Sequence, residues 1–289
     1  MLIGVDTGGT FTDFVVVTEN GLVIHKQPST PEDPSLAVSA GLAHLEAATG
    51  ASLVHGSTVA TNALLERRGA RAVLITTSGF EDVLEIGRQT RPEIYDLNVT
   101  RPAPLVPVER RLGVPERIGP DGSVLLRLTR EAIEEVVVTL RSLNADSVAV
   151  CLLHSYANEE HEAAILEALE GHFEGFCTAS HEILPEFREF ERCSTTAVNA
   201  YVGPVMAGYL GRLSDQLATE EVRIMQSNGG TISLDTAIEH AVQTVLSGPA
   251  GGVVGGFEIG SRAGFENVIT FDMGGTSTDV SLMRDGSPT

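Results

Sequence analysis

The chain has 289 residues, of which 39 are Asp or Glu and 19 are Lys or Arg, giving a formal charge of −20. This acidity, with no run of Lys and Arg longer than two residues, argues against nucleic acid or an anionic membrane as a partner. The length predicts about two domains with a large core. The regular recurrence of apolar residues excludes low-complexity disorder.

Strands and helices are predicted to alternate along the first third of the chain. Residues 2–6, 11–18 and 21–27 have the pattern of strands, with a turn at 19–21. A helix is predicted from Pro34, with Asp33 as its N-cap and Gly50 as its end. The strand-like residues 53–57, a helix over 58–69 and a buried strand over 70–77 follow.

The middle and the end of the chain continue this alternation after one interruption. Residues 86–120 are rich in proline and arginine, and they are predicted to be an irregular insertion with short extended pieces. Beyond it we expect a helix capped by Thr129, a helix capped by Asn158 that ends at Gly171, and a long helix over 187–217. A small-residue helix is expected over 247–260, and strands are expected over 147–154, 176–184, 222–227, 267–272 and 276–283.

Cysteines and targeting signals carry little functional information. Cys151, Cys177 and Cys193 form neither a CxxC pair nor a zinc-ligand spacing and are predicted to be free thiols. The eight histidines show no HxH or HxxxH spacing, which makes a structural zinc site improbable. We find no signal peptide and no run of about 18 apolar residues, and we therefore expect a cytoplasmic protein.

An internal repeat is the most informative feature. Residues 2–17 and 268–283 share a strand that ends in Asp, then Gly-Gly-Thr, then Thr-Asp and a second strand. From the first Asp to the last, the identical pairs are Asp6/Asp272, Gly8/Gly274, Gly9/Gly275, Thr10/Thr276, Thr12/Thr278 and Asp13/Asp279. Chance recurrence of this pattern is negligible.

The composition of the repeat suits phosphate chemistry. Adjacent glycines let backbone N–H groups approach an anion, and threonine hydroxyls add donors. An Asp beside a phosphate requires Mg²⁺ between them, or a role in orienting water. Neither a Walker loop nor a GxGxxG fingerprint is present. The alternative is that each motif is only a tight hairpin.

Seven segments resemble the hydantoinase A / 5-oxoprolinase family, the ATP-using subunit of N-methylhydantoinases, whose relatives include acetone and acetophenone carboxylase subunits. The resemblance covers essentially the whole chain and is carried by residues 4–13, 55–97, 151–162, 183–206, 225–230, 245–256 and 270–279. It implies an α/β fold of the actin/Hsp70/sugar-kinase (ribonuclease H-like) ATPase type. It also implies a hydantoinase/oxoprolinase N-terminal domain over 1–179 and the start of the ATPase domain over 180–289.

The chemistry implied by this resemblance is ATP-dependent hydrolysis of a cyclic amide such as a hydantoin or 5-oxoproline. Phosphorylation of the amide oxygen would turn it into a leaving group, after which water could open the ring. ATP and Mg²⁺ are the expected cofactors. A hydantoinase B-like subunit or domain is the expected partner in a hetero-oligomer.

The repeat supplies the expected nucleotide-binding residues. Asp6 and Asp272 are predicted to be the catalytic carboxylates that bind Mg²⁺, directly or through water. The predicted phosphate-loop residues are Gly8, Gly9, Thr10, Thr12, Gly274, Gly275, Thr276 and Thr278. Asp13 and Asp279 either point into the site or stabilise their hairpins.

Candidate substrate residues lie elsewhere, each with a structural alternative. His55, Thr58 and Asn62 are at a strand-to-helix junction, where ligands collect, but Ser57 or Thr58 could simply cap the helix. Arg88 and Arg91 could bind a carboxylate or imide, or form surface salt bridges.

Two further segments stay open between a site and a structural role. The charged run 186–192 is either a solvated helix face or part of an active site. Residues 247–252 are either an anion contact at a helix N-terminus or a close-packing turn.

Two rival functions use the same features: an ATP-using subunit of an acetone/acetophenone-type carboxylase, and a nucleotide-binding regulatory subunit without turnover of its own. A small-molecule kinase would need a general-base Asp that nothing singles out. Because the second motif begins only at residue 272, we expect an N-terminal fragment whose second lobe is incomplete. Such a fragment is expected to be inactive and to bind ATP weakly or not at all.

Overall fold

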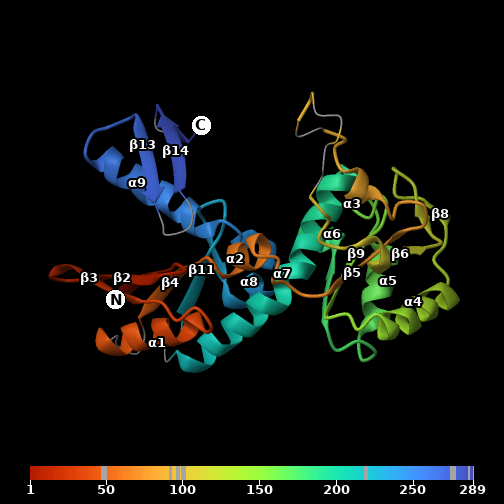
Figure 1. Cartoon of the computed structure of the whole chain (residues 1–289), viewed down its shortest axis with the longest axis horizontal. Coiled ribbons are helices and arrows are strands. Elements are labelled where there is room, and N and C mark those ends of the chain that lie inside the picture. Colours follow the sequence, from red (N-terminus) through yellow and green to blue (C-terminus); the bar gives the residue numbers. More distant parts are fainter. Residues whose placement is uncertain are drawn as a thin grey trace. The chain divides into compact units, whose positions relative to one another are not determined.

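The computed structural model describes residues 1–46, 51–90, 93–95, 98, 102–217, 221–273, 278–285 and 287–288 (Figure 1). The chain folds into two compact units, one of Met1–Arg67 with Val205–Thr289 and the other of Arg68–Pro204. The predicted segments 1–179 and 180–289 divide the sequence at a different place, and that division stays a prediction. Within the described ranges, no helix has the length and apolar character needed to cross a membrane.

The first unit contains a six-stranded mixed sheet. Its order is β12 (Thr231–Ser233), β11 (Glu221–Met225), β4 (Ser52–Ser57), β1 (Leu2–Thr7), β2 (Phe11–Thr18) and β3 (Gly21–Pro28). β1, β2 and β3 form an antiparallel meander, which confirms the predicted hairpins, and β4 and β11 continue the sheet in parallel with β1. The unit is therefore discontinuous in sequence because β11 pairs with β4.

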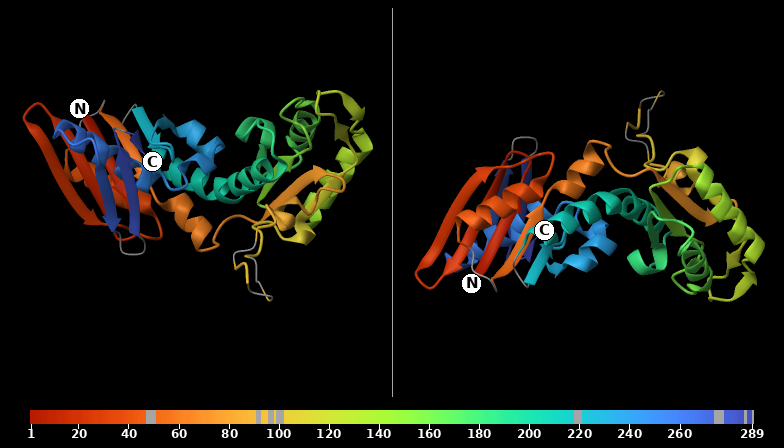
Figure 2. Two further views of the ribbon diagram at one scale, coloured as in Figure 1. Left: turned by 90° about the horizontal axis from the view of Figure 1, so that it is seen from above. Right: turned by 90° about the horizontal axis from the view of Figure 1, so that it is seen from below.

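Alternate residues of β1 and β2 build the core of this sheet. Ile3, Val5, Phe14 and Val16 are buried. Helix α1 (Pro34–His44) lies across these strands (Figure 2), and a Cβ on its Gly41 would approach the Phe14 ring to 2.1 Å. This helix therefore packs closely only because residue 41 has no side chain.

The start of α1 follows the prediction. The Asp33 carboxylate accepts the N–H of Ser35 at 3.2 Å, which confirms the N-cap. The helix ends at His44, and Gly50, its predicted end, lies outside the described residues. The short helices α2 (Val59–Leu65), α8 (Leu234–Glu239) and η2 (Ala241–Thr244) complete this part of the unit.

A smaller sheet follows helix α9 (Ser247–Arg262) in the same unit. β13 (Val268–Met273) pairs antiparallel with β14 (Thr278–Arg284), which pairs with β15 (Ser287–Pro288). Helix α9 lies on one face of β13, where Cβ atoms on Gly256 and Gly260 would approach Thr270 and Val268 to 2.5 and 2.6 Å. The predicted small-residue helix and the strands of the second hairpin are confirmed.

The second unit has a four-stranded parallel sheet covered on both faces. Its order is β10 (Phe176–Ala179), β9 (Ser147–Cys151), β5 (Ala72–Thr77) and β6 (Arg111–Val114). One face packs on α4 (Arg130–Ser142) and α5 (Glu160–Leu169), and the other packs on the first half of α7 (Glu189–Gln216). Double coverage explains why β5 and β9 are buried along their whole length.

Short elements and loops join these layers, and two predictions need correction. The short elements are α3 (Val83–Ile86), η1 (Val108–Arg110), β7 (Arg117–Ile118), β8 (Val124–Leu126) and α6 (Ser180–Ile183). Within the predicted insertion 86–120, β6 and β7 are short extended pieces, as predicted, and β6 pairs with β5 in the sheet.

The predicted strand 176–184 ends at Ala179. Beyond it, the Ser180 hydroxyl and the His181 N–H donate to the carboxylate of Glu162 and do not pair with a neighbouring strand. The Thr129 cap of α4 is confirmed. Helix α5 begins at Glu160, whose N–H is accepted by Asn158, and ends at Leu169 instead of Gly171.

Candidate functional site

The first glycine hairpin presents a row of charged side chains. Asp6, Asp13 and Lys26 lie opposite one another on β1, β2 and β3. The Nζ of Lys26 donates to the two carboxylate oxygens of Asp13 at 2.8 and 2.9 Å. Asp6 is exposed at the end of the row. The glycine turn follows directly, closed by the N–H of Gly8 donating to the carbonyl of Phe11 at 3.0 Å.

Ser29 holds this turn in place, although the sequence did not single it out. Its hydroxyl donates to the Gly8 carbonyl at 2.7 Å, and its N–H donates to the Thr10 carbonyl at 2.9 Å. Its Oγ also lies 3.0 Å from the hydroxyl of Thr12, which is completely buried. Gly9 and Thr10 are exposed, so they are the loop residues that a ligand can reach, whereas Thr12 is engaged inside the fold.

The second hairpin repeats the cross-strand pairing of the first. Asp272 lies opposite Asp279, as Asp6 lies opposite Asp13. Asp272 and Thr278, which begins β14, are exposed. The predicted loop residues Gly274, Gly275 and Thr276 lie outside the described residues.

The carboxylates of the two hairpins act on each other. Solvent reaches Asp6, yet the surrounding protein desolvates it enough to raise its pKa, and the charges of Asp13 and Asp272 raise the pKa further. The charge of Lys26 acts in the opposite direction. The fold thus brings the predicted pair, Asp6 and Asp272, within electrostatic range across about 266 residues of sequence.

Glycines leave open space beside both carboxylates. Gly248 and Gly252, one turn apart near the start of α9, would place Cβ atoms 3.8 Å from Asp6 Oδ1 and 3.7 Å from Asp272 Oδ2. At Gly56 of β4, a Cβ would lie 3.0 Å from Asp6 Oδ1. The 247–252 segment therefore lies beside the two carboxylates, and side chains there would fill the space around them.

These residues fit a magnesium nucleotide better than a bare metal ion. In the described part of the chain, no group of three or more His, Cys, Asp or Glu side chains could hold a metal. Mg²⁺ in nucleotide sites is usually bound by one or two carboxylates, waters and the phosphates themselves. Two facing carboxylates beside glycine turns match that donor set.

The junction 55–62 is arranged for packing. His55 is completely buried, with Nε2 2.5 Å from the Tyr209 hydroxyl, and burial lowers its pKa to about 4. The Thr58 hydroxyl donates to the Thr7 carbonyl at 3.2 Å and accepts from the Asn62 amide at 3.3 Å. Thr58 forms no side-chain cap. Substrate contact by His55, Thr58 and Asn62 stays a prediction.

The predicted arginines lie in the second unit. Arg88 forms an exposed ion pair with Glu191 at 2.8 Å, which matches the surface alternative, while Arg91 lies outside the described residues. In the charged run 186–192, Glu186 and Arg188 are exposed as a solvated face predicts. Arg192 is not, because it is completely buried.

Arg192 belongs to a buried polar cluster that the sequence did not reveal. Its guanidinium donates to the Leu152 carbonyl at 2.7 Å, to Ser180 Oγ at 2.5 Å and to Glu189. The buried carboxylate of Glu162 accepts the Leu152 N–H at 2.7 Å and Ser180 Oγ at 2.6 Å. The cluster ties the carboxyl end of β9 to α5, α6 and α7.

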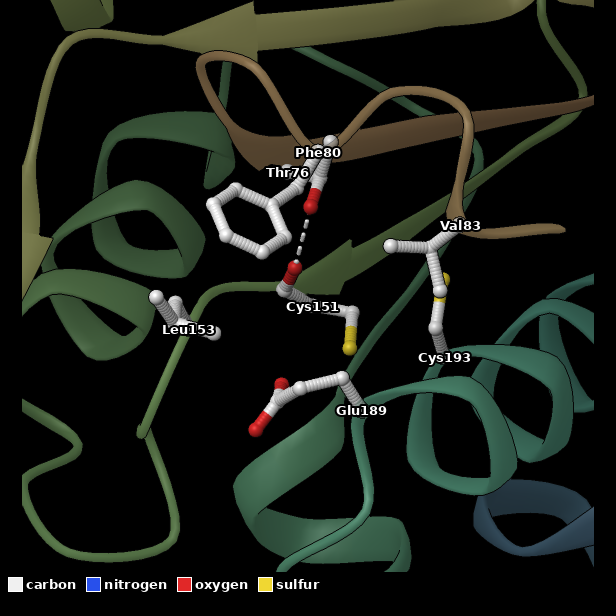
Figure 3. A pocket seen from close by; sticks show the side chains of 7 residues that line it. All are labelled: Thr76, Phe80, Val83, Cys151, Leu153, Glu189 and Cys193. Atoms are coloured by element: carbon white, nitrogen blue, oxygen red, sulfur yellow. Dashed lines mark hydrogen bonds between the residues drawn. The ribbon is translucent and has the colours of Figure 1, made fainter. Parts of the chain in front are cut away.

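A small pocket lies at the carboxyl ends of β5 and β9, next to this cluster (Figure 3). Its lining residues are Thr76, Phe80, Val83, Cys151, Leu153, Glu189 and Cys193. The contact with the Cys193 thiol and burial raise the pKa of Cys151 well above its usual value. The three cysteines are free, as predicted, and Cys151 is therefore a protonated, unreactive thiol.

Two family models match the chain. The hydantoinase/oxoprolinase N-terminal region matches residues 2–173, and hydantoinase/oxoprolinase matches residues 192–289. The chain belongs to the hydantoinase/oxoprolinase family. The resemblance seen in the sequence is thus confirmed over nearly the whole chain.

Members of this family with known activities share its fold and sequence. Caprolactamase subunit alpha of Pseudomonas jessenii is 37% identical over 98% of this chain and 43% of its own length. A chain of the ATP-dependent caprolactamase structure from that organism superposes with a TM-score of 0.83 at 35% identity, covering 98% of this chain and 43% of that one. The nucleotide-free structure of acetone carboxylase, from work on ATP-dependent acetone carboxylation, gives a TM-score of 0.87 at 31% identity over 100% of this chain and 44% of that one.

Another family member, 5-oxoprolinase 1 of Arabidopsis thaliana, is 35% identical over 98% of this chain and 25% of its own length. The chain therefore spans less than half of the length of each relative. The family relationship confirms the α/β fold with mixed and parallel sheets.

Proposed function

We propose that this protein takes part in the ATP-dependent hydrolysis of a cyclic amide, such as a hydantoin or 5-oxoproline. ATP, when bound, would supply the phosphoryl group that activates the amide carbonyl on its oxygen. Water would add to the carbonyl carbon, the ring C–N bond would break as the nitrogen takes up a proton, and the ring-opened acyl phosphate would then lose inorganic phosphate, which carries the former amide oxygen, to leave the carboxylate. The observation that carries the proposal is the convergence of Asp6 and Asp272, from the two copies of the repeat, in a family with caprolactamase and 5-oxoprolinase members.

The residues of the two hairpins would divide the work. Asp6 and Asp272 would hold Mg²⁺ through water, and the backbone amides of Gly8 and Gly9 would approach the phosphates. In the second hairpin, the corresponding residues are Gly274, Gly275, Thr276 and Thr278. The charge balance supports this assignment, because a bound cation would relieve the repulsion that raises the pKa of Asp6.

We also propose that residues 1–289 carry one lobe and the beginning of a second lobe of an actin-like ATPase. The support is the fraction of each relative that the chain spans, 43 to 44% for caprolactamase and acetone carboxylase. A hydantoinase B-like partner is proposed because a caprolactamase relative is itself named as a subunit. Calorimetric titration of residues 1–289 with magnesium ATP should detect only weak binding or none, and tight binding would contradict the incomplete lobe.

A carboxylase subunit is the second candidate. It is supported by the superposition on acetone carboxylase, with a TM-score of 0.87 at 31% identity. The same nucleotide site would then activate a ketone or bicarbonate instead of an amide.

The decisive experiment measures ADP release by the full-length protein, with and without its partner subunit. Lactams, hydantoins, 5-oxoproline, and acetone with bicarbonate are compared as substrates. With a lactam labelled by ¹⁸O at its carbonyl, the amide reaction should transfer the label to inorganic phosphate. No stimulation by any lactam or imide would overturn the main proposal, and stimulation by acetone with bicarbonate alone would establish the second candidate.

The matched variants test the site itself. Asp6→Ala and Asp272→Ala should each lower stimulated ATP hydrolysis by about a hundredfold, because each removes a charge that positions the cation. Asp215→Ala, which alters an exposed carboxylate on α7, is the control. Full hydrolysis by either of the first two variants would contradict the assignment.

A further inference from the structure

Lys26 is the only lysine of this sequence, whose 19 basic residues are otherwise arginine. It lies on β3 directly opposite Asp13, which lies opposite Asp6 on β1. The neighbouring residue Gln27 lies opposite Thr12, which directly follows Phe11 at the end of the glycine turn. The ammonium group therefore lies beside the base of the first glycine loop.

The charges around this loop are unbalanced. Asp6 and Asp13 lie opposite each other on β1 and β2, and Lys26 is the cation that forms an ion pair with Asp13. A phosphate chain approaching Gly8 and Gly9 would meet these carboxylates as well as the loop amides. It would bind more tightly if a cation from the protein offset part of that repulsion.

The contacts of Lys26 leave it available. Its ammonium donates to the two oxygens of Asp13 at 2.8 and 2.9 Å and lies 4.9 Å from the centre of the Phe11 ring. Its side chain is 54% exposed. An ammonium has three donors on a flexible stem, so it can bind a phosphate oxygen while it keeps one bond to the carboxylate.

We propose that Lys26 binds the terminal phosphates of the nucleotide at the first glycine loop. The inference rests on the proposed ATP-dependent function and adds the residue that supplies a positive charge to the site. Asp13 holds the ammonium beside the loop before the phosphate arrives. The alternative is an ordinary surface ion pair, which would contribute nothing to anion binding.

A single lysine permits a direct spectroscopic test. Biosynthetic labelling with lysine that carries ¹³C at its ε-carbon places the label at Lys26 alone and leaves all three N–H donors of the ammonium in place. Titration with magnesium tripolyphosphate should shift the Lys26 signal saturably, while sodium chloride at equal ionic strength should not. NMR detects millimolar affinity, so the test applies to residues 1–289. A shift that does not saturate, or that chloride reproduces, would overturn the proposal.

Variants of the full-length protein test the same point by calorimetry. Lys26→Gln should weaken tripolyphosphate binding by about three- to tenfold, and Lys26→Arg should restore most of it. Arg71→Gln is the matched control, because Arg71 pairs with Asp146 with nearly the same exposures, 56 and 42% against 54 and 42%. Equal affinity in wild type and Lys26→Gln, with unchanged melting temperatures, would show a surface ion pair only.

Failure of this inference differs from failure of the proposed function. If lactams stimulate ATP hydrolysis but Lys26→Gln binds tripolyphosphate as tightly as wild type, then Lys26 has no role in phosphate binding and the proposed reaction still stands. If tripolyphosphate binds saturably at Lys26 but no lactam, imide or ketone substrate is turned over, then the phosphate site stands and the proposed reaction is wrong.

Discussion

The two glycine hairpins share the same turn motif but have different surroundings. Ile3 of β1 is 0% exposed, and its repeat equivalent Ile269 of β13 is 69% exposed. Phe14 of β2 is also 0% exposed, whereas the equivalent Val280 of β14 is 62% exposed. The same apolar face is thus core in one copy and surface in the other.

The difference arises from the helices and strands around each copy. Helix α1 covers the apolar face of the first hairpin, and β4 continues its sheet. Helix α9 covers the opposite face of the second hairpin, the one that carries Thr270 and Val268. A hairpin motif therefore specifies its own strands and turn, while burial of its apolar face depends on segments distant in sequence. An apolar face this exposed is typical of a surface that another polypeptide segment covers.

Matched substitutions of one residue type test this comparison most strongly. Ile3→Ala should lower the free energy of unfolding by about 2–5 kcal/mol, because it leaves a cavity in a closed core. Ile269→Ala should change it by only about 0.5 kcal/mol, since the side chain already contacts water. Urea unfolding of both variants measures the difference. In a longer polypeptide that covers β13 and β14, the cost of Ile269→Ala should rise toward that of Ile3→Ala, and equal small costs there would contradict an incomplete second lobe.

The repeat and its alternating apolar residues made the first sheet and the second hairpin predictable. So did the small residues of α9, since a helix rich in glycine must pack closely on something. The convergence of Asp6 with Asp272 was expected from symmetry of the motif alone. The strands and the helix are local features that the spacing of residues predicts, whereas the convergence of the two carboxylates was expected only because the motif occurs twice.

The remaining features depend on partners far along the chain. Arg192 is in a run of charges typical of a solvated helix, and its burial depends in part on partners distant in sequence, Glu162, 30 residues earlier, and the Leu152 carbonyl. His55 lies near the carboxyl end of strand β4, where ligand residues often lie, yet it is buried against Tyr209. Ser29 was missed because nothing near it in sequence marks it as the residue that ties the glycine turn.

A pH titration tests strand β4, which pairs with β1 of the first hairpin. Among the described residues, no corresponding strand pairs with β13 of the second hairpin. His55 of β4 is paired with Val5, and burial holds its pKa near 4, below the ordinary 6.5. As the pH falls from 6.5 to 4, His55 becomes protonated in the unfolded chain but stays neutral in the folded chain. The free energy of unfolding should therefore fall by about 2–3 kcal/mol.

Urea unfolding at pH 7 and pH 4.5 measures this loss. His55→Gln should be less stable at pH 7 but should lose the part of the pH dependence that arises from residue 55. His172→Gln, at an exposed site, should retain it. The same pH dependence in His55→Gln as in wild type would show that another group is responsible.

The smallest expected effect lies where the two hairpins meet. The pKa of Asp6 is raised by desolvation and then by Asp13 and Asp272, so its ionised form costs stability. This cost is absent below the unfolded pKa of 3.8 and fully present above the raised folded value. In metal-free buffer at pH 7, Asp6→Asn should therefore raise the melting temperature by about 1–2 °C, a modest gain because solvent screens the exposed carboxylate.

Asp272→Asn should also raise the melting temperature, by less, since it relieves only one of the repulsions on Asp6. Asp215→Asn, at an exposed carboxylate on α7, is the control for loss of a negative charge in an acidic chain. The gain from Asp6→Asn should vanish as the pH falls below 3.8, where wild-type Asp6 becomes protonated in both states. A gain that persists there would come from packing, and the electrostatic coupling between the two hairpins would then be absent.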